Sequence, residues 1–137
     1  MSKKLSILLA ILCVIATGLS AAALSIACRP EEPVDIQYVM YLGTNDKDTD
    51  LPVFPPEEAK KQAEDILIGH FGGYTIQEAS GGWVDGDTVY QEYTLVIYLS
   101  DTDLEHVHTA ADELIDVFHQ SSVLIQANQT KTEFYAG

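Results

Sequence analysis

The sequence predicts an α+β domain of the ferredoxin-like split βαβ class, in which two helices cover one face of an antiparallel sheet. The segments expected along residues 36–137 follow the order β-α-β-β-α-β. Strand-like segments alternate apolar and polar residues, whereas two segments repeat apolar residues every three or four positions, as helices do. An Asp-Gly turn joins the two central strands. Such an order leaves the second face of the sheet open.

The first strand and the first helix are expected before residue 73. Residues 36–43 alternate and are rich in β-formers, which predicts a strand. Two prolines and two glutamates at positions 55–58 mark a helix start, because proline suits the first turn and carboxylates suit the positive end of the helix dipole. Apolar residues recur at helical spacing from Ala59 to Leu67, and Gly72 ends the helix.

A central hairpin follows. Residues 74–84 and 88–99 read as its two strands on either side of Asp85 and Gly86. The strand 88–99 is apolar on both faces. One of these faces carries Tyr90, Val96 and Tyr98. If the helices cover the other face, these residues form an exposed patch with Val39 and Tyr41, and exposed apolar patches usually mark a partner site. The alternative is that the closing segment or a homodimer partner covers them.

The second helix and the closing strand complete the order. One of residues 100–103 caps the helix, whose apolar stripe runs from Leu104 to Phe118. Residues 122–127 supply the closing strand, and residues 131–135 could add a short strand after a turn at residues 128–129. Trp83 either packs on the hairpin or stacks on a ligand such as a sugar or a peptide. The candidate binding surface therefore consists of Trp83, Tyr90, Val96 and Tyr98.

The N-terminal residues 1–28 read as a signal peptide or membrane anchor, followed by an acidic, proline-containing tether at 29–35 and the folded domain at 36–137. Two lysines precede an uncharged run at residues 5–27, which is long enough to span a bilayer. Three fates stay open: lipidation of Cys28 as a lipoprotein anchor, an uncleaved anchor helix, or ordinary signal cleavage. All three place the domain outside the cytoplasm. The first two attach it to the cell membrane, whereas ordinary cleavage releases it.

The charge of the chain restricts its partners. All 21 acidic residues follow position 28, against five basic ones there, so this part has a net charge of −16. Such a surface repels phosphate backbones, which excludes nucleic acid as a partner. The only cysteines are Cys13 and Cys28, so the domain has no internal disulfide and depends on its hydrophobic core.

An acidic stretch offers a possible divalent-cation site. Asp46, Asp48 and Asp50 alternate, and Glu57 follows eleven positions after the first, a spacing that is similar to a calcium loop. Leu51 replaces the glycine that such a loop needs for its sharp turn. The alternatives are a calcium site or a solvated acidic loop. A row of His and acidic residues on the second helix is likewise open to metal binding, although polar residues are expected on that face.

Catalysis finds little support, because the chain has neither a G-x-S-x-G motif nor a cysteine after position 28. The function hypothesis is therefore a membrane-tethered, extracytoplasmic binding or interaction domain without catalysis and without a cofactor. Its partner is a second copy or another envelope protein. The alternative is a cation-binding protein or small metal-dependent enzyme that uses the acidic loop.

Three stretches suggest a family resemblance: residues 41–49, 72–85 and 121–137. They resemble small, uncharacterised bacterial proteins that are often exported or lipid-anchored. The resemblance covers nearly the whole domain. It implies a ferredoxin-like fold, and it implies no activity and no site residues.

Overall fold

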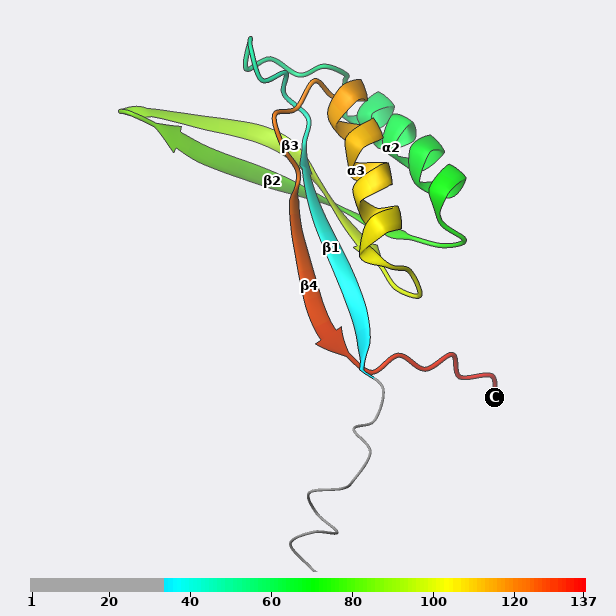
Figure 1. The fold of residues 1–137 in the computed structure, drawn as a ribbon. Helices are drawn as coiled ribbons and strands as arrows, with labels where there is room; N and C mark the ends of the chain where they lie inside the picture. The colour runs from blue at the N-terminus through cyan, green and yellow to red at the C-terminus, as the bar shows by residue number, and fades with distance from the viewer. Residues whose placement is uncertain (1–33) are drawn as a thin grey trace, which may run out of the picture. The chain divides into compact units, whose positions relative to one another are not determined.

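Residues 34–137 are described by the computed structural model (Figure 1). Their elements, in chain order, are β1 (Asp35–Gly43), α2 (Pro56–His70), β2 (Thr75–Asp85), β3 (Thr88–Leu99), α3 (Leu104–Val117) and β4 (Leu124–Thr130). The expected signal or anchor segment, with Cys28, and nearly all of the tether lie outside the described residues. Within residues 34–137, no helix has the length and apolar character to cross a bilayer.

The four strands form one antiparallel sheet in the order β2-β3-β1-β4. Both helices lie on one side of this sheet (Figure 1). The ferredoxin-like prediction is therefore confirmed. In this order β1 and β3 are central, whereas β2 and β4 are the edge strands.

The hydrophobic core fills the space between the helices and the sheet. Alternate residues of the central strands point into it, and α2 and α3 supply the opposite layer. The most deeply buried large side chains are Met40, Leu42, Leu67, Leu95, Ile97, Leu99, Leu114 and Phe118. All members of this cluster among the described residues follow Val34, so a segment of residues 29–137 contains all of them.

Local sequence explains where the helices begin. Pro56 opens α2, and Glu57 and Glu58 lie in its first turn, where the helix dipole favours negative charge. Asp103 caps α3, because its Oδ1 accepts a hydrogen bond of 3.0 Å from the backbone N–H of His106. Asp103 is one of the four capping residues that the sequence left open.

Several strand boundaries differ from expectation. β2 spans Thr75–Asp85 instead of residues 74–84, and β4 begins at Leu124 instead of residue 122. β1 begins at Asp35, one residue earlier than predicted. β4 continues through Asn128 and Gln129, where a turn was predicted, because these residues pair with Gln37 and Ile36 of β1. Residues 131–137 consequently contain no further strand.

Candidate interaction surface on the open sheet face

The candidate site is the side of the sheet that the helices leave uncovered, which we call the open face. Because side chains alternate along a strand, the residues between the core positions point to this side. The cross-strand register places the following twelve at its centre: Gln37, Val39, Tyr41, Thr75, Gln77, Ala79, Thr94, Val96, Tyr98, Leu124, Gln126 and Asn128. None of the twelve is charged, although the chain carries 21 acidic residues.

A block of two valines and two tyrosines lies at the centre of the open face. Val39 pairs with Tyr98, and Tyr41 pairs with Val96, so each valine has a tyrosine beside it and another along its own strand. The exposed fractions of Val39 and Val96 are only 3% and 7%, although no helix covers this side. The tyrosine rings therefore shield the valines and present a continuous apolar surface.

Hydrogen bonds to the edge strands hold the two tyrosine rings across the sheet. The Tyr41 hydroxyl donates to Oε1 of Gln126 on β4 at 3.2 Å. The Tyr98 hydroxyl donates to Oε1 of Gln77 on β2, also at 3.2 Å. Each ring thus points from a central strand toward an edge strand. This arrangement fixes the shape of the block before any partner binds.

Trp83 and Tyr90 lie on the same side of the sheet, further along the β2–β3 hairpin. They are cross-strand partners. Their rings stack with centroids 4.4 Å apart and planes 14° apart. Trp83 therefore packs on the hairpin, which was one of the two alternatives for it, while about half of the residue stays exposed.

Glu92 and Thr94 separate this stacked pair from the valine–tyrosine block. The Glu92 carboxylate lies over Gly43, where a Cβ would collide with it, and accepts a hydrogen bond of 3.3 Å from the backbone N–H of Asn45. The Thr94 hydroxyl is buried, and no hydrogen-bond partner is found for it among the described residues. A buried hydroxyl without a hydrogen-bond partner lowers the stability of the fold. The Thr94 hydroxyl is therefore an unpaired polar group beside the apolar block.

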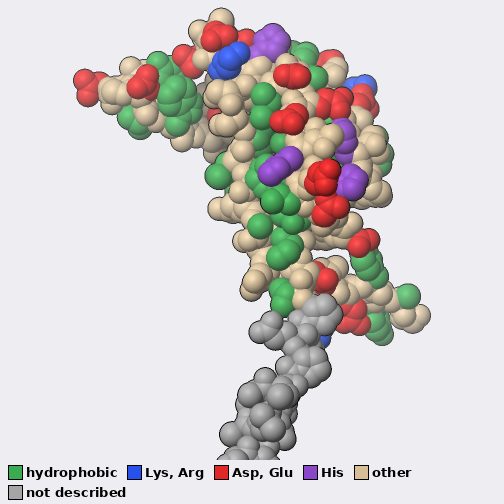
Figure 2. Space-filling view, viewed as in Figure 1, with side chains coloured by type: hydrophobic (Ala, Val, Ile, Leu, Met, Phe, Trp, Pro, Cys, Tyr) green, Lys and Arg blue, Asp and Glu red, His purple; other side chains and the backbone are tan. Residues whose placement is uncertain are grey.

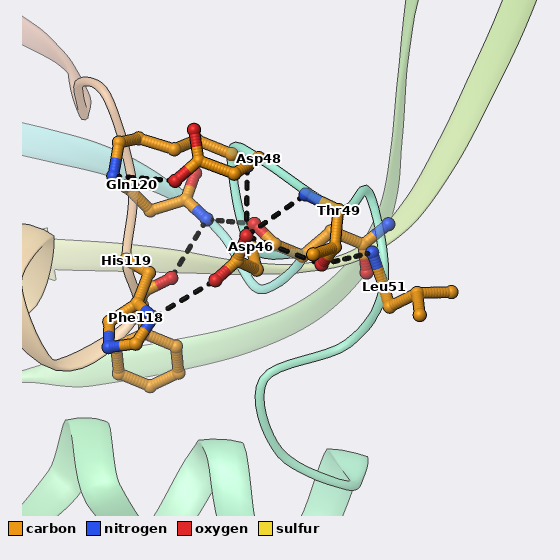
Figure 3. Close-up of polar contacts among 9 residues, drawn as sticks. Asp46, Asp48, Thr49, Leu51, Phe118, His119 and Gln120 are labelled. Atoms are coloured by element: carbon orange, nitrogen blue, oxygen red, sulfur yellow. Dashed lines mark hydrogen bonds and ion pairs between the residues drawn. The ribbon is translucent and has the colours of Figure 1, made fainter.

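The acidic loop after β1 is organised by one carboxylate, that of Asp46 (Figure 3). Its Oδ1 accepts hydrogen bonds from the backbone N–H groups of Asp48 at 2.8 Å and Thr49 at 3.0 Å. Its Oδ2 lies 2.9 Å from Nδ1 of His119, just beyond α3. The bond from Asp48, and then the contact with His119, lower the pKa of Asp46 from its usual 3.8 to about 2.

Further contacts fasten this loop to the end of α3. The backbone N–H of Lys47 donates to the carbonyl of His119 at 3.1 Å, and the Gln120 side chain donates to the carbonyl of Asn45. The Asp46 carboxylate is therefore already satisfied by protein donors. The loop acts as a clamp between the end of β1 and the end of α3.

The predicted calcium ligands are not gathered into a metal site. Within residues 34–137, no three His, Cys, Asp or Glu side chains form a group that could hold an ion. Asp46 is engaged as above, Asp48 contacts Lys47, and Glu57 belongs to the first turn of α2. The calcium hypothesis, and the metal-binding row on the second helix, gain no support from this geometry.

A cavity of about 1060 Å³ lies where β1 begins, α2 ends and α3 begins. Several of its polar groups are already paired with one another. Asp103 lies 2.9 Å from His106, and the Asp35 carboxylate accepts the backbone N–H of Thr132 at 2.8 Å. The open face remains the stronger candidate, because its tyrosines are held in a fixed arrangement on an apolar surface.

The structure separates the four residues that the sequence grouped as a binding surface. Val96 and Tyr98 belong to the central block, whereas Trp83 and Tyr90 lie on the distal part of the hairpin. Eight residues separate Tyr90 from Tyr98 along β3, which is about 26 Å of extended strand. The anchoring roles of Gln77 and Gln126 were missed, because they depend on cross-strand register.

Comparisons with known proteins define the fold class. No family model matches the chain, and no curated protein matches it. Among solved structures, a phage SAM lyase in complex with S-methyl-5'-thioadenosine is similar, with a TM-score of 0.54 and 17% identity over 80% of this chain and 98% of its own.

Two further structures are more distantly similar. The divalent ion tolerance protein CutA1 from Ehrlichia chaffeensis has a TM-score of 0.49 and 12% identity over 75% of this chain and 88% of its own. GlnK from B. subtilis, in complex with ATP, has a TM-score of 0.37 and 13% identity over 70% of this chain and 84% of its own. At 17% identity, the similarity to the phage SAM lyase extends to the fold alone. The resemblance to exported bacterial proteins is supported in its fold alone.

Proposed function

We propose that this protein is a non-catalytic interaction module, tethered to the outer side of the cell membrane, that associates with a second copy of itself through the open face. The observation that carries the proposal is the uncharged valine–tyrosine block on a domain whose net charge is −16. Cores of protein interfaces are enriched in tyrosine and depleted in charge. The tyrosines are already held in place, which lowers the entropy cost of binding.

The extent of the surface favours a protein over a small ligand. Along β3, Tyr90 of the stack lies about 20 Å from Val96, the nearest residue of the block, and about 26 Å from Tyr98. A small molecule could contact the stack or the block, whereas a protein surface can contact both. Stable interfaces bury about 800 Å² on each partner, so such an interface involves many side chains of one face.

The distribution of charge favours a second copy as the partner. Two copies repel each other wherever their acidic surfaces meet. Acidic side chains are spread over the helical side of the molecule (Figure 2). The twelve residues at the centre of the open face carry no charge, whereas its acidic residues Asp35 and Glu92 lie nearer the ends of the strands. Two open faces can therefore meet at their centres with little local repulsion.

The test is the solution mass of residues 29–137 and of two variants with an added charge on the open face. Tyr98→Asp places a carboxylate in the block, and Leu124→Asp does so at a side chain that is already 59% exposed, where folding is not at risk. We expect the wild-type mass to be a multiple of the monomer mass in light scattering. Both variants should be monomeric, because a buried, unpaired carboxylate costs several kcal/mol, about 3–5.

The matched control is Leu104→Asp, which adds the same charge on α3 at a side chain that is 44% exposed and lies outside the open face. It should keep the wild-type mass. A wild-type monomer, or equal masses for Leu104→Asp and Leu124→Asp, would remove self-association through this face.

Attachment to the membrane is proposed from the N-terminal sequence. The uncharged run at residues 5–27 and Cys28 support it. We expect the intact mass of the protein from its native membrane to show a chain that begins at Cys28 and carries lipid, or an unprocessed chain. Recovery of a lipid-free chain without residues 1–27 from the soluble fraction would contradict tethering.

A further inference from the structure

The distal part of the β2–β3 hairpin projects beyond the rest of the sheet, and we call residues 80–93 the arm (Figure 1). The last pair between β1 and β3 is Gly43 with Thr94. The β2–β3 ladder continues beyond that point for six more pairs, from Ser80 with Tyr93 to Asp85 with Thr88. The arm is therefore a two-stranded ribbon.

Both faces of the arm expose apolar side chains. Trp83 and Tyr90 stack on one face. Val84 and Val89 pair on the other, with exposed fractions of 65% and 68%. Figure 2 shows hydrophobic side chains gathered on the arm and acidic ones at its tip. A two-stranded ribbon is marginally stable in water, whereas a third strand with apolar contacts makes it stable.

The outer edge of the arm is open to such a strand. β2 is an edge strand, and its residues 80–84 contain neither a charge nor a proline. Natural edge strands are usually protected by charged residues, prolines or bulges, because their unpaired backbone groups attract other strands. The glycines at positions 81 and 82 also leave this edge free of bulky side chains.

The tail, residues 131–137, is a segment that could supply a third strand and apolar contacts to the arm. It is not part of a helix or strand, and its aromatic residues Phe134 and Tyr135 are 82% and 85% exposed. Adjacent residues of a strand point to opposite faces. An added strand from this tail would therefore supply one aromatic ring to each face of the arm.

We propose that the tail of a second copy adds as a third strand to the outer edge of the arm, with Phe134 packing on Val84 and Val89 and Tyr135 packing beside Trp83. This inference rests on the proposed self-association and names the segments that exchange. Strand addition gains its affinity from main-chain hydrogen bonds and its specificity from alternate side chains.

The tail must come from another copy because its own arm is out of reach. Thr130 pairs with Asp35, at the end of β1 opposite the arm. β1 has nine residues and is roughly 26 Å long at about 3.3 Å per residue. Tyr135 follows Thr130 by five residues, which extend over at most about 18 Å. A tail cannot place these aromatic residues on the arm of its own chain.

The experiment is disulfide trapping between chains, because residues 29–137 contain no cysteine. A chain with Val84→Cys is mixed with a differently tagged chain with Phe134→Cys under mild oxidation, and the mixed disulfide is measured by mass. The control mixes Phe134→Cys with Ile68→Cys, a side chain on α2 that is 60% exposed. Docking holds two thiols at about 1 mM effective concentration, so at about 10 μM protein the first pair should react about 100-fold faster.

Equal trapping rates for the two pairs would overturn the docking of the tail on the arm. This result is distinguishable from failure of the proposed function. If Leu124→Asp is monomeric and the trapping rates are equal, the open face mediates association and the tail does not. If trapping is selective while Leu124→Asp keeps the wild-type mass, the tail exchange stands and the open-face contact fails.

Discussion

Asp46 shows how one side chain decides what an acidic loop does. Its carboxylate accepts backbone N–H groups of its own loop and contacts His119 near the end of α3. Hydrogen bonds to a carboxylate favour its charged form, which is why its pKa falls to about 2. From the sequence alone, Asp46 was predicted to be a possible cation ligand. Its structural role depends on a contact 73 residues away along the chain.

At the residue scale, we predict that Asp46→Asn lowers the melting temperature at pH 5 and that the difference from wild type shrinks in acid. A carboxyl group with a lowered pKa stabilises the fold above its unfolded value of 3.8. That contribution is lost as the pH falls through about 2. Melting curves from pH 5 to pH 2 measure the effect.

The control for this prediction is Asp48→Asn, because that side chain is 76% exposed and contacts Lys47 on the surface. Its melting temperature should follow the wild type at every pH. A constant difference between Asp46→Asn and wild type down to pH 2 would show that the Asp46 charge does not stabilise the loop.

At the element scale, local patterns predicted every helix and strand of residues 34–137. Helix α2 follows its prolines and glutamates, and the hairpin follows its Asp-Gly turn. Pairing between strands that are distant in the sequence determined which strand residues are exposed and where β4 ends. Alternation along β3 puts Val89 on the same face as the core residues Leu95 and Ile97, yet it is 68% exposed because β3 extends past β1 at that point. The end of β4 was missed because Asn128 and Gln129 are held by pairing with β1.

Helix α3 offers the element-scale prediction. Leu114 is fully buried in the core, whereas Leu104 on the same helix is 44% exposed. We expect Leu114→Ala to lower the free energy of unfolding by about 2–5 kcal/mol, because it removes buried methyl groups and leaves a cavity. Leu104→Ala should change it by no more than about 0.5 kcal/mol. Urea unfolding of both variants measures this, and similar losses would contradict the assignment of the core face.

At the scale of the whole molecule, the separation of charge from apolar surface is the main functional feature. The sequence could show a strongly acidic chain and a surplus of tyrosines. It could not show that the centre of the open face carries no charge, because that depends on which residues of four strands lie side by side. The exposure of both apolar faces of the arm could not be predicted either, because it also depends on which strands pair.

The most direct test of this account is the equilibrium sedimentation mass of residues 29–137 at low and high salt. Raising the ionic strength from about 0.01 M to 0.15 M shortens the Debye length from about 30 Å to about 8 Å, which screens the repulsion between copies. We predict a mass that is a multiple of the monomer mass, with association that strengthens as salt rises. A monomer mass at every concentration and salt level would contradict the account.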